Sequence, residues 1–536
     1  NLTDGNLTID SMNARVGGTA DSLDIDANLT GKEFQTQLET QFFPGKNMKV
    51  LLSEWKIFYK NQHWALEQVP AIFEADSVNY SLENFNLASG EGDTAQHINA
   101  HGKLSLKGKE DFELRLENID ARKIMGLFSP DPLIYGFLDA VLLVKGTADA
   151  PLIKGDFDLK ESAYKDYRIP GFNGSFNLSG NQFFLKTLVT LQDSGQIKLS
   201  AQLPLVIRID SMDIQYNPED SIRAGLLVEK LTLDMLKSLY PRGDYSGLIN
   251  GEINVGGTTE NPVPKGTFQL TEGAFQMESY GINYQNILLD VRLTGEKIKL
   301  DTLRIESNDG NLAGNGIARF ASGVYNEGIN RSTINLKFRK FNPLNHPRFN
   351  MQLSGGAWLE GEEDNLIFGG DLNVPQAEIY LPAILNMMGR MSTPDMPRPL
   401  LVREAEKQGI AIDSFNIESF EMARSDSLET DYLNHFQGKI QLSIPKNTWI
   451  KNENMRIEIS GETELIKNKE FFELFGTLSV VRGQYDLLGK TFIIQEGIIR
   501  FQGGESMTPQ INLTASYTFR NPERMEQTLT VDISGT

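Results

Sequence analysis

The chain contains no cysteine, and this absence excludes disulfide frameworks, thiolate zinc sites and cysteine nucleophiles. Basic residues are also scarce, because 51 lysines and arginines against 71 aspartates and glutamates give a formal charge of −20 over 536 residues. A protein that binds DNA or RNA neutralises phosphates with clustered lysine and arginine. The charge balance therefore argues against a nucleic-acid partner.

Long apolar runs are missing as well. The longest apolar stretch covers residues 133–144 and contains Asp139, so it falls short of the ~18–20 residues that a membrane-spanning helix needs. The chain begins with Asn1 rather than methionine, and residues 528–536 still have the pattern of a strand. We therefore expect both ends to be internal to a longer protein, with any membrane anchor outside this sequence.

The usual signatures of catalysis and metal binding are also absent from the sequence. Among the five histidines the only close pair is His97 and His101, and on one strand these would lie ~13 Å apart, too far to share an ion. The complete phosphate-loop motif Gly-x-x-x-x-Gly-Lys-Thr/Ser, the zinc-protease motif and the Gly-x-Ser-x-Gly elbow do not occur. We expect no enzyme activity, no cofactor and no metal.

A period of two dominates what is present. In residues 196–203 every second side chain is apolar (Ile197, Leu199, Ala201, Leu203), which is typical of a strand with one dry and one wet face. The same alternation recurs along the chain, in residues 23–29, 112–116, 298–300, 334–338, 440–444, 455–459, 511–519 and 529–533. Glycine-containing turns separate these segments. The pattern predicts an all-β, mainly antiparallel protein.

Helical patterns are short and local. Residues 119–128 and 231–240 carry apolar residues at spacings of three and four, and Pro130 and Pro241 follow them as stops. We expect a short helix at each place. Residues 385–409, rich in methionine and proline, interrupt the strand pattern, and we interpret them as a mobile insertion rather than a domain.

The chain also repeats itself at an interval of 111 residues. Residues 130–163 and 241–274 share twelve identities in 34 aligned positions, Gly136/Gly247 among them. From this repeat and the insertion we predict segments 1–118, 119–229, 230–340, 341–435 and a C-terminal domain over 436–536.

Strands with one apolar face must have that face covered by a second sheet, by closure into a barrel or by a non-protein ligand. A sandwich core is the simplest alternative, but the apolar faces persist over hundreds of residues with little sign of a second sheet of matching length. A parallel β-helix would repeat every ~20–25 residues, which is not observed. The repeats favour one elongated, continuous sheet that curls into a trough whose dry face suits acyl chains.

The residues expected to line this trough are the apolar members of the alternating segments. They are Leu104, Leu114, Phe157, Leu159, Ile197, Leu199, Leu203, Phe268, Leu270, Ile298, Leu300, Leu336, Ile440, Leu442, Ile444, Ile457, Leu478, Val480, Ile511 and Leu513.

The C-terminal part resembles a known family. The run Glu473 to Phe501, which includes Gly483-Gln-Tyr-Asp-Leu-Leu-Gly489, and the run Pro509 to Tyr517 are similar to the C-terminal domain of the TamB family of AsmA-like, bridge-like lipid-transfer proteins. The segment Pro445 to Asn452 resembles the Bacteroidetes-like versions. This family resemblance implies a curled β-sheet ("β-taco") in the periplasm of Gram-negative bacteria, anchored to the inner membrane by an N-terminal helix that this sequence lacks.

The resemblance also implies two functions. In the first, the sheet carries phospholipid between inner and outer membrane and supports outer-membrane biogenesis. In the alternative, the protein helps an outer-membrane barrel of the Omp85 type (TamA- or TamL-like) to insert other proteins by β-augmentation. Either function needs a docking region near the C-terminus, for which we expect Gly483, Tyr485, Gly489, Phe492, Ile494, Gly497 and Phe501.

Overall fold

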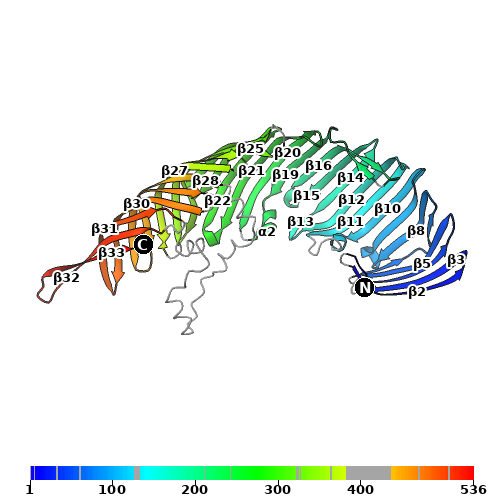
Figure 1. Ribbon diagram of the computed structural model, residues 1–536, viewed down its shortest axis with the longest axis horizontal. Helices are drawn as coiled ribbons and strands as arrows, with labels where there is room; N and C mark the ends of the chain where they lie inside the picture. The colour runs from blue at the N-terminus through cyan, green and yellow to red at the C-terminus, as the bar shows by residue number, and fades with distance from the viewer. Residues whose placement is uncertain are drawn as a thin grey trace. The chain divides into compact units, whose positions relative to one another are not determined.

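A computed structural model describes residues 2–4, 7–31, 34–59, 62–125, 133–211, 213–241, 243–321, 325, 328–362, 365–381, 436–468, 471–504 and 508–535 (Figure 1). Thirty-one strands are hydrogen-bonded into one sheet, which confirms the all-β, mainly antiparallel prediction. The chain divides into two compact units, one of residues 1–238 and 249–266 and the other of residues 239–248 and 267–536. The insertion expected at 385–409 lies outside the described residues.

In the first unit, each strand of the sheet pairs mostly with the next strand along the chain. Two short strands, β6 and β7, lie end to end between β5 and β8, because both pair with each of those strands. The strands up to the end of this unit are β1 (Leu2–Asp4), β2 (Leu7–Thr19), β3 (Ser22–Gly31), β4 (Phe34–Phe43), β5 (Met48–Tyr59), β6 (Gln62–Leu66), β7 (Ala71–Ala75), β8 (Asn79–Ser89), β9 (Gln96–Ser105), β10 (Lys109–Asp120), β11 (Ile134–Thr147), β12 (Ala150–Tyr164), β13 (Tyr167–Ile169), β14 (Gly171–Ser179), β15 (Gln182–Thr190), β16 (Gln196–Pro204), β17 (Val206–Arg208), β18 (Asp213–Gln215) and β19 (Arg223–Thr232). Strands β17 and β18 form a separate two-stranded hairpin.

The chain passes from the first unit to the second within β20 (Asp244–Gly257) and β21 (Pro262–Met277). The remaining strands are β22 (Ile282–Thr294), β23 (Lys297–Ser307), β24 (Gly310–Phe320), β25 (Ile329–His346), β26 (Phe349–Glu362), β27 (Asn365–Tyr380), β28 (Phe436–Lys451), β29 (Met455–Asn468), β30 (Phe471–Leu487), β31 (Lys490–Gln502), β32 (Gln510–Arg520) and β33 (Glu526–Gly535). From β22 onward the pairing is antiparallel except between β27 and β28, which run parallel.

Short helices occur where the sequence predicts them, but they are shorter than expected. Helix α1 covers Ala121–Met125 and α2 covers Met235–Leu239; the predicted end of the first, residues 126–128, lies outside the described residues. Ile119, predicted as helical, instead lies in β10, pairs with Leu138 and is 2% exposed. Burial of its side chain in the sheet outweighs the weak local helical pattern. The described residues also form the single-turn 3₁₀ helices η1 (Gly92–Thr94), η2 (Gln192–Ser194) and η3 (Glu278–Tyr280).

The two copies of the 111-residue repeat share their backbone conformation. Gly136 and Gly247 have φ angles of 135° and 137°, and the non-glycine residues Glu161 and Glu272 have φ angles of 49° and 53°. Such angles are uncommon for glutamate, so their recurrence at the same repeat position indicates a shared local geometry. The segment boundaries proposed from the repeat stay a prediction.

A second feature recurs at intervals of about 110 residues. Asn118, Lys230, Lys340 and Asn447 each have a φ angle between 48° and 66° within a strand. The backbone N–H of each donates to a side-chain oxygen of the following strand; the acceptors are Asp139 Oδ1, Asn250 Oδ1, Ser354 Oγ and Glu458 Oε1, at 2.6, 2.9, 2.9 and 2.9 Å. Three of the four sites coincide with register shifts, and therefore act as side-chain-capped β-bulges that bend the sheet locally.

Candidate functional site: the apolar face of the sheet

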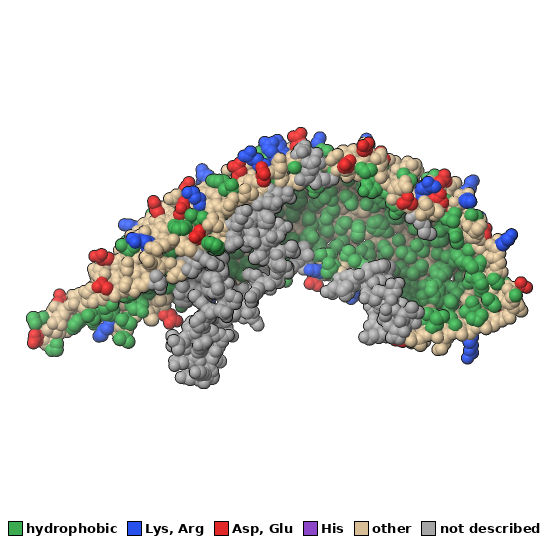
Figure 2. Space-filling model, in the orientation of Figure 1, with side chains coloured by type: hydrophobic (Ala, Val, Ile, Leu, Met, Phe, Trp, Pro, Cys, Tyr) green, Lys and Arg blue, Asp and Glu red, His purple; other side chains and the backbone are tan. Residues whose placement is uncertain are grey.

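The strand register places apolar side chains on the same face of successive strands, which we call the apolar face. In the first unit Leu114 of β10 pairs with Ala100 of β9 and with Leu142 of β11. Further along, Leu199 of β16 pairs with Leu226 of β19. Figure 2 shows hydrophobic side chains gathered on the hollowed side of the first unit, whereas lysine, arginine, aspartate and glutamate project from the other side.

The apolar face contains pairs of phenylalanine and glycine. Phe157 of β12 pairs with Gly174 of β14, and Phe176 of β14 pairs with Gly155 of β12. A Cβ atom on Gly155 would lie 2.2 Å from Cζ of Phe176, and one on Gly174 would lie 2.6 Å from Cζ of Phe157. Each ring therefore occupies the space above the opposite glycine and fills the gap that the missing side chain would leave in the apolar face.

These pairs were missed in the sequence. Phe172, Phe176 and Phe183 belong to the apolar face, because Phe172 pairs with Leu159 and Phe183 with Leu178. Glycine occupies an apolar-face position between Phe172 and Phe176, which interrupts the run of large residues that marks a dry face. Treating Gly174 as a member of the apolar alternation would have found Phe172 and Phe176.

The predicted lining residues are distributed over both units. In the first unit they lie on β9 (Leu104), β10 (Leu114), β12 (Phe157, Leu159) and β16 (Ile197, Leu199, Leu203). In the second they lie on β21 (Phe268, Leu270), β23 (Ile298, Leu300), β25 (Leu336), β28 (Ile440, Leu442, Ile444), β29 (Ile457), β30 (Leu478, Val480) and β32 (Ile511, Leu513).

Most of these side chains are half-buried, as expected for a sheet whose apolar face is open to solvent. Leu159, Ile457 and Leu478 are buried, and Leu199 is 36% exposed. The others fall in between. Large apolar side chains left half-exposed over many strands are unusual for a self-contained core and indicate a binding surface.

The end of the second unit differs, because there the apolar side chains are packed closed. Ile457, Ile459, Leu478, Phe492, Ile494, Ile499 and Ala515 form one buried cluster, and Ile459 is 2% exposed. Val480, Ile511 and Phe501 pack against it. The apolar face from β29 to β32 is therefore mostly occupied by its own side chains.

The predicted docking residues lie on β30, β31 and the turn between them. Gly483 pairs with Ile494 and Tyr485 with Phe492, and both Phe492 and Ile494 belong to the buried cluster. Gly497 and Phe501 lie further along β31. Gly489 has a φ angle of 72° in a two-residue turn with Leu488, whose side chain is 94% exposed. Ile493 and Ile498, on the opposite side of β31, are 49% and 44% exposed.

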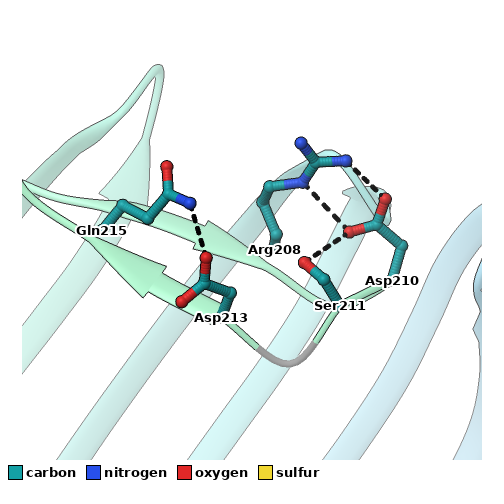
Figure 3. A network of polar contacts seen from close by, with 5 residues as sticks. All are labelled: Arg208, Asp210, Ser211, Asp213 and Gln215. Carbon is teal, nitrogen blue, oxygen red and sulfur yellow. Dashed lines mark hydrogen bonds and ion pairs between the residues drawn. The ribbon is translucent and has the colours of Figure 1, made fainter.

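The opposite surface, which we call the polar face, carries cross-strand ion pairs such as Lys198 with Glu229 at 2.8 Å. Figure 3 shows the polar contacts of the β17–β18 hairpin, where Arg208 donates to both carboxylate oxygens of Asp210 at 3.1 and 2.7 Å. The pKa of Asp210 is lowered by this hydrogen bond. These exposed pairs orient side chains but contribute little stability.

One ionisable group is held by the bulge at Asn447. Glu458 is 5% exposed, and its carboxylate accepts a hydrogen bond from the N–H of Asn447 and another from Arg482 Nε at 2.5 Å. The hydrogen bond from Asn447 and the pairing with Arg482 lower the pKa of Glu458. By contrast, burial raises the pKa of Glu110, at one end of β10.

The histidines of the described ranges do not converge on a common site. His97 lies 3.6 Å from Glu67 and His101 lies 4.0 Å from Glu113, so each histidine faces its own glutamate. The described residues contain no group of three metal-ligand side chains, and none of their helices has the length and apolarity to span a bilayer.

Comparison with known proteins gives a family match in the C-terminal part and a longer match to one relative. Residues 301–536 fit the family model described as the TamB C-terminal domain. The chain is 22% identical over 369 residues to the translocation and assembly module subunit TamB of Haemophilus influenzae, a match that covers 67% of this chain and 26% of that relative. The chain thus spans much less than two thirds of that relative's length. The resemblance seen in the C-terminal residues is confirmed.

Proposed function

Because the chain is a distant homologue of TamB and its residues 301–536 match the TamB C-terminal domain, we propose that it is part of a non-catalytic bridge in the bacterial periplasm. This bridge carries phospholipid between the inner and outer membranes along the apolar face and so supports outer-membrane biogenesis. The observation that carries the proposal is the half-buried state of the apolar face, from Leu104 on β9 to Leu203 on β16.

The physical basis is the hydrophobic effect. An acyl chain laid on the apolar face removes water from both surfaces and gains ~0.8 kcal/mol per buried CH₂ group. This attraction requires no polar pocket, so acyl chains of different lengths bind by the same mechanism. The headgroup stays in water beside the sheet, which avoids the cost of burying a charge.

A contact at the outer membrane is the second part of the proposal. The relative is named as a subunit of a translocation and assembly module, so we propose an outer-membrane barrel of the Omp85 type as the partner of this chain. Exposed Leu488, Ile493 and Ile498 support a contact through the β30–β31 hairpin. Since Phe492 and Ile494 are buried, this contact uses the turn and the polar face of β31 rather than all seven residues predicted from the sequence.

The experiment compares two substitutions that differ by one position. Leu199→Asp places a charge on the apolar face, and Ser200→Asp places one on the opposite face of the same strand. Both proteins are purified, and their bound phospholipid is measured by lipid extraction and native mass spectrometry. We expect Leu199→Asp to lose most of the bound lipid and Ser200→Asp to keep it, because a charge among acyl chains costs several kcal/mol.

Photocrosslinkers at Leu300 and Leu488 separate the two functions. We expect lipid at Leu300 and a barrel protein at Leu488. Capture of unfolded outer-membrane protein at Leu300, with no lipid, would replace the conduit by the assembly function through β-augmentation. Equal lipid binding by the parent and Leu199→Asp proteins would also refute the conduit.

A further inference from the structure

An exposed tryptophan lies on the polar face of the second unit. Trp358 of β26 pairs with Gly369 of β27 and is 43% exposed. The ring atoms Cζ2, Cε2 and Nε1 lie 2.5, 2.6 and 2.9 Å from the position that a Cβ atom on Gly369 would occupy. The edge of the indole that these three atoms form therefore lies over Gly369, in space that a side chain there would fill. With 43% of its surface exposed, Trp358 also presents apolar ring surface to solvent.

Polar side chains surround this ring. The ring is part of the lining of an open depression of about 420 Å³. The lining also includes Arg331 of β25, Glu360 and Glu362 of β26, and Asn365 and Ile367 of β27. This volume lies within the ~300–1,000 Å³ of small-molecule sites. Several of the polar groups are held in place.

Two contacts fix the orientation of these groups. The guanidinium of Arg331 pairs with Glu360, and the pKa of Arg331 is raised by this hydrogen bond and by the charges of Glu360 and Glu362. Asn365 Oδ1 accepts a hydrogen bond from Gln437 Nε2 at 2.7 Å, which leaves the amide N–H₂ of Asn365 pointing elsewhere. The depression therefore combines one flat apolar platform with planar donors and acceptors at its rim.

The charges indicate which ligand fits. Two carboxylates against one guanidinium give the depression a net negative charge, which disfavours phosphates and other anions. A ligand that matches has an apolar flat side to lie on the indole and hydroxyl groups around its edge to exchange hydrogen bonds with carboxylate, guanidinium and amide. A neutral sugar ring has both properties. We propose that this depression binds a neutral carbohydrate chain through Trp358.

The test uses the whole chain and a panel of soluble neutral oligosaccharides: the β-1,4-linked N-acetylglucosamine tetramer, cellotetraose and maltotetraose. Binding is followed by isothermal titration and by tryptophan fluorescence. We expect at least one member of the panel to bind with a Kd at or below about 1 mM. Trp358→Ala should weaken that binding at least tenfold, and Trp358→Phe should keep part of it.

Two further variants make the result specific. Glu360→Gln removes a rim charge and should weaken binding, whereas Leu288→Ala removes an exposed apolar side chain of β22 and should leave oligosaccharide binding unchanged. Bound phospholipid should be the same in all four variants, so failure here is distinct from failure of the conduit. The proposal is overturned if no oligosaccharide binds at about 10 mM or if Trp358→Ala binds the sugars like the parent. It is also overturned if the depression binds a peptide that none of the sugars displaces.

Discussion

The ring of Phe176 lies directly over Gly155 on the neighbouring strand, and a Cβ atom on that glycine would come within 2.2 Å of Cζ of the ring. Phe157 and Gly174 repeat the arrangement in the opposite direction on the same two strands. Glycine is needed at these positions for space rather than for an unusual backbone angle. The phenylalanine rings cover backbone that would otherwise be bare.

This relationship predicts that Gly155→Val destabilises the first unit by ~1–3 kcal/mol, because the added methyl groups force Phe176 out of its rotamer. Gly256→Ala is the control, since its Cβ would meet nothing within 4 Å, and it should change stability by less than about 0.5 kcal/mol. Urea unfolding followed by circular dichroism measures both. Equal effects of the two substitutions would show that the space above Gly155 does not matter.

The strand residues with positive φ angles predict an unusual response to glycine. Lys230 has a φ angle of 52°, which costs a non-glycine residue ~1 kcal/mol, so Lys230→Gly should leave stability unchanged or raise it by up to ~1 kcal/mol. Lys186, in the middle of β15, is the matched control, because glycine in an extended strand destabilises. The thermal unfolding midpoint should fall for Lys186→Gly and stay the same or rise for Lys230→Gly. A similar decrease in both variants would contradict a strained backbone at Lys230.

Glu458 predicts a pH dependence. Its folded pKa is lowered by the hydrogen bond from Asn447 and by Arg482, so its stabilising effect is present above the pKa of an unfolded glutamate and is lost as the pH falls through the folded value. Glu458→Gln should therefore cost ~1–3 kcal/mol at pH 7. The difference between parent and variant should shrink below about pH 4, close to the ordinary glutamate pKa. Denaturant titrations at several pH values measure this, and a constant difference would rule it out.

The packed and open parts of the apolar face predict different mutational costs. Ile459 is 2% exposed in the buried cluster, so Ile459→Ala should cost ~2–5 kcal/mol. Leu300 is half-buried on β23 of the same unit. Leu300→Ala should therefore lower the free energy of unfolding clearly less, because the leucine side chain is already partly in contact with water. Unfolding in guanidinium compares them. A larger loss for Leu300→Ala would mean that its part of the face is covered by protein.

The sequence was sufficient to predict which face of a strand each side chain takes, but not which side chains pack over that face. Alternation alone placed Ile197, Leu199 and Leu203 on one side of β16, because the side-chain period of a strand is fixed by its backbone. The closed packing around Ile459 depends on the curvature of several strands together, which no local pattern records.

Backbone exceptions were equally hidden. A lysine with positive φ, as at Lys230, looks like any surface lysine in the sequence, and only the structure shows that Asn118 and Lys340 share this backbone conformation. The parallel pairing of β27 with β28 was missed because alternation shows which face a side chain takes but not the direction of the neighbouring strand. Trp358 gave no signal in the sequence either, because the position of its ring depends on Gly369 of the neighbouring strand.

The repeat also determines how this sheet can change in length. Six antiparallel steps lead from β10 to β19, the two strands that precede α1 and α2, so β19 runs in the same direction as β10. An even number of strands means that one copy can be duplicated or deleted by recombination without reversing the chain or exchanging its faces. At ~4.8 Å per strand, each such event would alter the reach of the sheet by a fixed increment of about 29 Å. Length is thus a property that this fold can adjust in discrete units, independently of what the surface binds.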